Sequence, residues 1–220
     1  LEQIWEHVPA AHVLIVDDSS PDGTGEWVDQ RRAGEERLHV LHRPAKSGLA
    51  TAYVDGMGWG IEAGFSFLLQ MDADGSHRPS DLPKLLARMG GPDRPDLVIG
   101  SRWVRGGKVN GWSAKRVALS KAGNYYVRLC LGTPVRDATA GLRVHRCAFL
   151  AAHGVLERVS TTGFGFQVEM TERERSLGAV IREVPITFDE RIAGESKLDS
   201  SIFVEELAMV TKGGLSRLAQ

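Results

Sequence analysis

The chain has few cysteines, almost no net charge and no long apolar run, and each shortage narrows the classes of protein to which it can belong. Its two cysteines, Cys130 and Cys147, lie in apolar surroundings without the spacing of metal ligands. We therefore expect two small buried side chains, which is compatible with a reducing compartment.

Lys and Arg total 27 against 28 Asp and Glu, for a net charge of -1. This balance gives no support to nucleic acid as a partner, although a local basic cluster can still hold an anionic ligand.

No apolar stretch approaches the roughly 20 residues that a membrane-spanning helix requires, and no charged and then apolar leader precedes the first element. The chain begins at Leu1 rather than Met, so we expect residues ahead of it. With 220 residues, 42% of them hydrophobic and 25% charged, the sequence fits a single domain, 1–220, with one core.

Short β-rich apolar runs alternate with longer helical patterns over the first hundred residues. The predicted strands cover 12–16, 38–41, 65–71 and 96–99, with helices between them. This alternation is typical of an α/β protein with a mainly parallel sheet flanked by helices, in which ligands bind at the carboxyl ends of the strands. After Gly100 a Gly-rich loop precedes a long predicted helix at about 112–131, and the tail ends in an amphipathic helix from about Ser201.

Two carboxylates follow the third predicted strand directly. The strand leads into Asp72-Ala-Asp74-Gly-Ser76, and residues two apart in an extended chain point the same way. Asp72 and Asp74 can therefore address one cation. Mg²⁺ or Mn²⁺ suits them, because such ions accept one or two carboxylates and keep positions for phosphate and water. Asp-x-Asp alone also fits a solvated turn, but the buried strand ahead of it favours the metal site.

The first predicted strand also ends in acids, Asp17 and Asp18, at a place where a carboxylate accepts hydrogen bonds from a base or a ribose. An acidic strand end counts against a Rossmann dehydrogenase, which needs a Gly-rich turn there. The run Gly56-Met-Gly58-Trp-Gly60 does not supply that turn, because it lies within a helical pattern and lacks the final spacing.

Basic residues recur in the second half of the chain. Arg102 follows a predicted strand end, while Arg191 and Lys197 flank a Gly/Ser segment that includes Ser196. Each basic residue taken alone fits a solvated surface position. Their setting favours phosphate binding, with the segment containing Ser196 and Lys197 folding over the phosphates as a lid.

The remaining candidates lie on the long predicted helix and in two polar segments. Arg116 and Ser120 are four residues apart on the helix, so they share a face and can grip one phosphate together. Asp137 and Gln167 lie in polar interruptions beside apolar runs. Each either lines a sugar pocket or marks a plain turn or helix beginning, and spacing alone does not separate these interpretations.

Five segments, in order along nearly the whole chain, resemble polyprenol (dolichol) phosphate mannose synthases of glycosyltransferase family 2, and the actinobacterial polyprenol monophosphomannose synthases are the most similar. The segments are Val-Asp-Asp-Ser-Ser-Pro-Asp-Gly-Thr, Met-Asp-Ala-Asp-Gly-Ser-His, Ile-Gly-Ser-Arg, Asp-Ala-Thr-Ala-Gly and Ile-Thr-Phe-Asp-Glu-Arg-Ile-Ala-Gly-Glu-Ser-Lys. The resemblance implies a glycosyltransferase-A fold, a divalent metal, GDP-mannose as donor and inverting transfer of mannose to polyprenyl phosphate. It also implies a cytoplasmic protein in peripheral contact with the cytoplasmic face of the membrane.

Carried over residue by residue, the resemblance makes Asp72 and Asp74 the metal-binding acids, with Ser76 where some relatives have a Gln ligand. It makes Asp17 and Asp18 the nucleotide-contacting acids of a nucleotide-binding half at about 1–100.

In the acceptor half, at about 101–220, Arg102 and Arg191 match contacts to the diphosphate or the acceptor phosphate. Arg116 and Ser120 match the acceptor-side helix. Asp137 and Gln167 fall in matching motifs without an assigned role.

One departure from the family concerns the first strand. Relatives begin with a strand that ends in a Pro-x-Tyr-Asn-Glu type motif, and nothing before His12 matches it. Residues 1–8 instead fit the helix that follows that strand. A sheet without an interior strand would leave neighbouring backbone groups unpaired, so we expect residues ahead of Leu1 to supply it.

The residues argue against a glycoside hydrolase and leave two other interpretations open. A glycoside hydrolase needs two carboxyl groups roughly 5 to 9.5 Å apart, and two acids on one strand end fit a metal better. UDP-glucose stays open as the donor, because the motifs fix the phosphates more firmly than the base or the sugar. A non-catalytic nucleotide-sugar-binding subunit stays open because the first strand is missing.

Two predicted helices offer apolar faces for membrane contact: the long helix with Trp112, Tyr125 and Tyr126, and the last helix with Ile202 and Phe203. Equally, each apolar face covers the sheet. A membrane-embedded partner protein also stays open.

Overall fold

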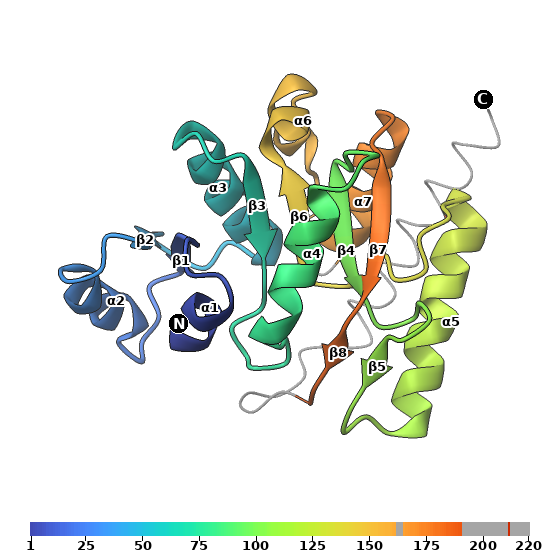
Figure 1. Cartoon of the computed structure of the whole chain (residues 1–220), viewed down its shortest axis with the longest axis horizontal. Coiled ribbons are helices and arrows are strands. Elements are labelled where there is room, and N and C mark those ends of the chain that lie inside the picture. The colour runs from blue at the N-terminus through green and yellow to red at the C-terminus, as the bar shows by residue number, and fades with distance from the viewer. Residues whose placement is uncertain (162–164, 191–210, 212–220) are drawn as a thin grey trace.

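The computed structural model describes residues 1–161, 165–190 and 211. Strands and helices alternate along most of the chain (Figure 1). The strands are β1 (Val13–Asp17), β2 (Leu38–His42), β3 (Phe67–Gln70), β4 (Leu97–Ser101), β5 (Lys108–Val109), β6 (Arg143–Arg146), β7 (Ile181–Pro185) and β8 (Thr187–Phe188). The α-helices are α1 (Glu2–His7), α2 (Thr24–Arg32), α3 (Leu49–Glu62), α4 (Leu82–Met89), α5 (Ala114–Leu131), α6 (Cys147–Ala152) and α7 (Phe166–Ser176).

The strands pair into a parallel β1-β2 sheet, a four-stranded sheet in the order β3-β6-β4-β7, and a parallel β5-β8 pair. Within the four-stranded sheet β4 and β7 are parallel, whereas β6 runs antiparallel to both β3 and β4. The predicted α/β class with parallel strand pairs flanked by helices is confirmed. The reversed direction of β6 is a feature that the sequence pattern did not indicate.

Helix α3 packs against both the β1-β2 sheet and the four-stranded sheet. A Cβ atom on Gly56 would lie 3.0 Å from Val16 of β1, and one on Gly60 would lie 2.2 Å from Leu68 of β3. The two glycines, one turn apart, thus let the helix approach both strands closely. Among the described residues β1 pairs only with β2 and β3 only with β6, so each has one edge without a partner strand. The expected additional interior strand stays a prediction.

Side chains alternate along β4 between two apolar clusters. Leu97 and Ile99 join Val127 and Leu131 of α5 on one face, while Val98 packs with residues of α4 on the other. All five residues of β4 are buried. Helices therefore cover both faces of the four-stranded sheet (Figure 1).

The four predicted strands of the first hundred residues correspond to β1, β2, β3 and β4, and the long predicted helix corresponds to α5. Trp112 precedes that helix, whose N-cap is Ser113. Cys147 is buried and Cys130 half-buried, and both are free thiols. The predicted helix from about Ser201 lies outside the described residues. Within the described ranges, none of the helices combines the length and apolar character needed to cross a bilayer.

Candidate active site

The acidic end of β1 is fixed by α2 and by an arginine that follows β2. Asp17 is buried, and its carboxylate accepts a hydrogen bond from the Ser20 backbone N–H at 3.3 Å. A Cβ atom on Gly25 would lie 2.6 Å from Asp17 Oδ2, so glycine is needed for α2 to approach this acid. Asp18 is more exposed and lies 2.7 Å from Nη1 of Arg43. Of the two acids, Asp18 is therefore the more accessible from solvent.

Asp72 and Asp74 follow β3, and neighbouring side chains orient both carboxylates. Tyr53 donates its hydroxyl to Asp72 Oδ1 at 2.9 Å. Burial and that carboxylate raise the pKa of Tyr53, so the phenol keeps the proton that it donates. Ser76 donates to Asp74 Oδ1 from its backbone N–H at 3.0 Å and from its hydroxyl at 2.5 Å. The buried His77 places Nε2 3.6 Å from Asp72 Oδ2.

The first turns of α3 connect the two acidic strand ends. Arg43 donates from Nη2 to Thr51 Oγ1 at 2.7 Å, and its Nε lies 2.9 Å from Asp55 Oδ2. Tyr53, between these two residues in the sequence, reaches Asp72. Because one short stretch of α3 contacts both groups, the ends of β1 and β3 belong to one site.

The segment 137–141, which precedes β6, borders this site and is held by Arg102. Arg102 donates from Nε and Nη2 to the two carboxylate oxygens of Asp137 at 2.8 and 2.6 Å, and from Nη2 to Thr139 Oγ1 at 2.9 Å. Glu183 accepts from the Asp137 backbone N–H at 3.0 Å. A Cβ atom on Gly141 would lie 3.0 Å from Asp72 Oδ2. Arg102 thus fixes a segment that lies directly against Asp72.

Buried polar side chains support the same segment from within the protein. The Gln70 amide donates to the Gly141 carbonyl at 3.0 Å and to Gln167 Oε1 at 2.8 Å. Arg143 donates to two further carbonyls of the segment at 2.6 and 2.8 Å. Burial lowers the pKa of Arg143 to about 10, so its guanidinium stays charged at neutral pH. The position of the segment is therefore set by side chains of β3, β6 and α7.

The inner side of α5 also meets this segment. Asn124 donates from Nδ2 to the Ser120 carbonyl and to Thr139 Oγ1, both at 3.0 Å. One turn before Ser120, Arg116 places Nη1 2.6 Å from Glu190 Oε1. Arg116 and Ser120 therefore lie on the same side of α5 as Asn124, which contacts the segment 137–141.

The residues present fit a divalent cation bound by two carboxylates. Asp72 and Asp74 are oriented by hydrogen-bond donors, as ligands of a metal usually are. Within the described residues neither ring nitrogen of the buried His77 has a hydrogen-bond partner, although Nε2 lies near Asp72. The described residues contain no cluster of three or more His, Cys, Asp or Glu side chains with the geometry of a metal site. Two carboxylates with phosphate and water is the arrangement that Mg²⁺ and Mn²⁺ accept.

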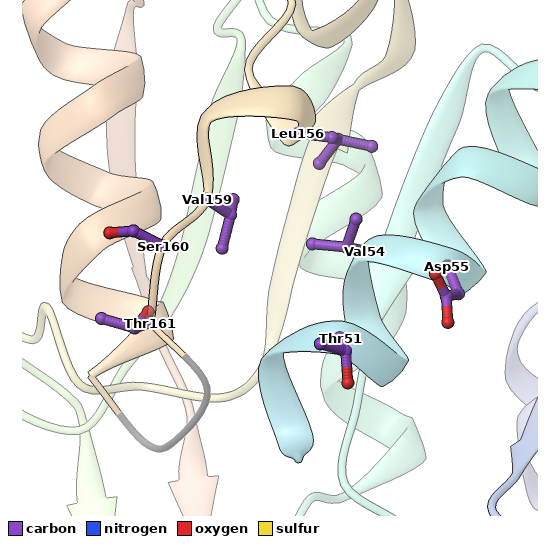
Figure 2. A pocket seen from close by; sticks show the side chains of 7 residues that line it. All are labelled: Thr51, Val54, Asp55, Leu156, Val159, Ser160 and Thr161. Carbon is purple, nitrogen blue, oxygen red and sulfur yellow. The ribbon is translucent and has the colours of Figure 1, made fainter. Parts of the chain in front are cut away.

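A cavity of about 160 Å³ lies between α3 and the segment 156–161 (Figure 2). Its apolar wall is formed by Val54, Leu156 and Val159, and its rim includes Thr51 and Asp55, which both contact Arg43. Sites for small ligands usually measure about 300 Å³ or more. The cavity by itself is therefore too small to hold a nucleotide sugar.

Several predicted site residues have other neighbours than expected, or lie outside the described part of the chain. Asp137 and Gln167 are buried and bonded within the protein, to Arg102 and Gln70, so they support the segment 137–141. Their direct contact with a sugar stays a prediction. Ser76 holds Asp74, and its role as a ligand also stays a prediction. The other three, Arg191, Ser196 and Lys197, lie outside the described residues.

Sequence reasoning assigned no role to Arg43, Tyr53 or His77. Arg43 follows a predicted strand end, the same signal that selected Asp17 and Arg102, and it could have been found in that way. His77 lies next to the acidic motif. Nothing in the helical pattern of 49–62 distinguishes Tyr53, whose role depends on how α3 packs.

The comparisons with known proteins agree with this geometry. The family model described as glycosyl transferase family 2 matches residues 1–154. An undecaprenyl-phosphate mannosyltransferase of Micrococcus luteus is 48% identical over 216 residues, which is 98% of this chain and 87% of the relative. A polyprenol monophosphomannose synthase of Mycolicibacterium smegmatis is 44% identical over 208 residues, or 94% of this chain and 77% of that protein.

Solved structures with a similar fold include glucosyl-3-phosphoglycerate synthase from Mycobacterium tuberculosis in complex with phosphoglyceric acid. Its TM-score is 0.63 at 17% identity, over 97% of this chain and 73% of that one. Another crystal structure of that synthase, with Mn²⁺, uridine diphosphate and glucosyl-3-phosphoglycerate, has a TM-score of 0.62 with the same identity and coverage. These structures share the fold of nucleotide-sugar transferases. Given the family match and the two close relatives, the chain belongs to glycosyl transferase family 2 and has the glycosyltransferase-A fold.

Proposed function

We propose that the protein transfers mannose from GDP-mannose to a polyprenyl phosphate with inversion, releasing GDP. The observation that carries this proposal is the oriented pair Asp72 and Asp74 at the end of β3, bordered by the segment 137–141. The names of the two relatives, which are 44% and 48% identical, supply the sugar and the lipid phosphate.

Asp72 and Asp74 would hold the divalent cation, Mg²⁺ or Mn²⁺, and Tyr53 and Ser76 would keep their carboxylates in position. When bound, the cation neutralises the negative charge that develops on the departing nucleoside diphosphate. Asp18, paired with Arg43 at the end of β1, accepts hydrogen bonds from the nucleoside. The metal identity, the base and the sugar are parts of the proposal that donor and metal assays test.

The acceptor needs positioning more than activation. A phosphate monoester has a second pKa near ~6 and is already an anion at neutral pH, so its attack requires no general base. A phosphate oxygen forms a bond to the anomeric carbon as the bond from that carbon to the diphosphate breaks on the opposite side. Arg116 and Ser120 on α5 hold the acceptor phosphate in line, and Arg191, Ser196 and Lys197 are proposed to complete its binding.

Arg102 has a dual role in this proposal. Its Nε and Nη2 atoms donate to Asp137 and Thr139 and so fix the segment 137–141. Its Nη1 atom makes none of these hydrogen bonds, and we propose that it contacts a phosphate. The guanidinium lies 5.4 Å from the Trp103 ring and 5.5 Å from the Trp112 ring, which limits its movement. A rigid cation beside the segment 137–141 suits an anion that must be held in one orientation.

The proposal is tested by incubating the full chain with a short-chain polyprenyl phosphate and GDP-mannose or UDP-glucose, with Mg²⁺, Mn²⁺ or EDTA. Mass spectrometry would detect the glycolipid. We expect mannolipid from GDP-mannose only when metal is present. Glucolipid from UDP-glucose alone would overturn the donor assignment, and mannolipid formed equally well in EDTA would overturn the role of the metal.

A further inference from the structure

Two arginines that are proposed to meet the acceptor phosphate lie against the same indole ring. The Cζ atom of Arg116 is 4.0 Å from the centre of the Trp112 ring, and that of Arg102 is 5.5 Å from it. A guanidinium within about 6 Å of an aromatic centroid is attracted to the ring, and tryptophan attracts it most strongly. The half-buried Trp112 is therefore a side chain that the two guanidiniums share.

The sequence ahead of α5 determines where this ring lies. Ser113 is the N-cap of α5, and its hydroxyl accepts a hydrogen bond from the Arg116 backbone N–H at 3.3 Å. Trp112 precedes the cap and so lies beside the first turn, in which Arg116 is the third helical residue. Gly111 has a φ of +79°, and a Cβ atom there would lie 2.7 Å from the Cβ atom of Glu190, which pairs with Arg116. The indole, the guanidinium and its carboxylate partner are thus gathered by one turn.

Aromatic contacts connect Trp112 to the acidic end of β3. Its ring meets the buried Phe188 edge to face, with centroids 5.5 Å apart, and Phe188 meets His77 in the same way at 5.0 Å. His77 in turn places Nε2 3.6 Å from Asp72 Oδ2. These three rings, His77, Phe188 and Trp112, form an aromatic wall that runs from the acid to the start of α5.

Backbone pairing keeps the middle of the aromatic wall in place. Phe188 lies opposite Val109 in the β5-β8 pair, and its carbonyl accepts a hydrogen bond from the Asn110 N–H at 2.8 Å. The next residue, Asp189, donates its backbone N–H to the Ser76 carbonyl at 2.9 Å. Because closely packed rings on a paired backbone move little, the wall fixes the spacing between the two arginines and the acids that follow β3.

We propose that Trp112 is a positioning residue for the acceptor phosphate, and that it aligns the guanidiniums of Arg102 and Arg116. Through the aromatic wall it also sets their distance from the two acids at the end of β3. The inference rests on the proposed function, in which the arginines hold the phosphate and the acids hold the cation. Attack requires the phosphate oxygen to lie about 3 to 3.5 Å from the anomeric carbon, so a small displacement of the arginines costs binding and rate.

Three variants of the full chain test this role. Trp112→Leu removes the ring but keeps an apolar side chain, Trp112→Phe keeps an aromatic face, and Arg116→Gln removes the guanidinium while keeping helix propensity. Trp5→Leu is the matched control, because the Cζ atom of Arg37 lies 4.8 Å from the centre of the Trp5 ring, in α1 and away from α5 (Figure 1). Circular dichroism and thermal melts check that each variant folds.

Calorimetry measures the binding of a short-chain polyprenyl phosphate in the presence of GDP and Mg²⁺, so that the readout requires no turnover. We expect Trp112→Leu to weaken this binding about tenfold and Trp112→Phe about threefold, with Trp5→Leu like the unmodified chain. The affinity of Trp112→Leu for GDP alone should stay that of the unmodified chain. Equal losses of GDP and acceptor affinity would overturn the inference, because they would show a general disturbance of the site.

The double variant Trp112→Leu/Arg116→Gln separates positioning from a merely structural role. If the indole acts through Arg116, its removal has little further effect once the guanidinium is absent. The double variant should therefore bind the acceptor only about twofold more weakly than Arg116→Gln. A further loss of about tenfold would mean that the two effects are independent, and would overturn the inference.

If Trp112→Leu does not fold, Trp112→Phe takes its place in the double variant. No loss of acceptor binding by Trp112→Phe, or a loss that persists in full without the guanidinium, would then overturn the inference. Acceptor binding by a folded Trp112→Leu that matches the unmodified chain would do the same. Failure of the proposed function looks different: the unmodified chain would bind polyprenyl phosphate in a way that depends on Trp112 and yet form no mannolipid.

Discussion

Substituting Asp137 with alanine should destabilise the fold strongly, because it leaves the Arg102 guanidinium without its counter-charge. Asp137 is fully buried and the Arg102 side chain is 8% exposed. The carboxylate accepts three hydrogen bonds from Arg102: one from the backbone N–H at 2.8 Å and two from the side chain at 2.8 and 2.6 Å. Removing one partner of such a buried pair costs about 3 to 5 kcal/mol, since the remaining charge stays out of water.

Glu172→Ala provides a matched control for this substitution. Glu172 accepts two hydrogen bonds from Arg175 at 2.8 and 2.6 Å, the same lengths as the Arg102 pair. The side chains of Glu172 and Arg175 are both about one third exposed. Glu172→Ala should therefore lower the free energy of unfolding by at most about 1 kcal/mol. Equilibrium unfolding in urea measures both. If Asp137→Ala lowers the free energy of unfolding no more than Glu172→Ala does, burial does not make the Arg102–Asp137 pair more stabilising than an exposed pair, and the reasoning is wrong.

Three further substitutions test other contacts. Tyr53→Phe keeps the ring that stacks on Phe166, with ring centroids 5.5 Å apart, but removes the hydroxyl that donates to Asp72. The metal concentration for half-maximal transfer should therefore rise about tenfold. An unchanged metal titration would count against this role of Tyr53. Gly58→Ala should raise the free energy of unfolding by up to about 1 kcal/mol, because the added Cβ contacts no neighbouring atom within 4 Å. Gly60→Ala should lower it, because the added Cβ would clash with Leu68. Urea unfolding that gave the opposite signs would refute the packing of α3. For Glu169, burial opposes ionisation but hydrogen bonds from Thr161 and Ser160 outweigh it and lower the pKa. A lowered pKa in the folded state stabilises the fold above the unfolded pKa of about 4.3, and this stabilisation is lost as pH falls through the folded pKa. The free energy of unfolding should therefore exceed that of Glu169→Gln by less at acidic than at neutral pH. A difference that stays constant with pH would contradict the lowered pKa.

The sequence was sufficient to predict the acids at the strand ends. Apolar runs followed at once by Asp17-Asp18 and by Asp72-Ala-Asp74 could be placed at the carboxyl edge of a sheet because strands buried by helices share that geometry. Which of the first two acids faces outward was not predictable. It depends on the approach of Gly25 to Asp17 and of Arg43 to Asp18, and both are tertiary contacts.

The pairing of Arg102 with Asp137 was also beyond the sequence. The two residues are 35 positions apart, and they meet because the chain returns through the segment 137–141 into the antiparallel strand β6. A periodicity argument that expected parallel strands gave no reason to join them. For the same reason the sequence left Asp137 open between a sugar pocket and a plain turn, and gave no sign that its side chain is buried.

The most direct test of the account is the initial rate of metal-dependent mannolipid formation by Asp72→Asn, beside the unmodified chain and a Glu172→Gln control. Asparagine keeps the size of the side chain and its hydrogen bond with Tyr53 but removes the charge that a divalent cation requires. The account predicts a rate lower by about a thousandfold, with the control unchanged and the fold intact by circular dichroism. Near-normal turnover by Asp72→Asn at the same metal concentration would contradict it, because the carboxylate at the end of β3 would then hold no metal needed for transfer.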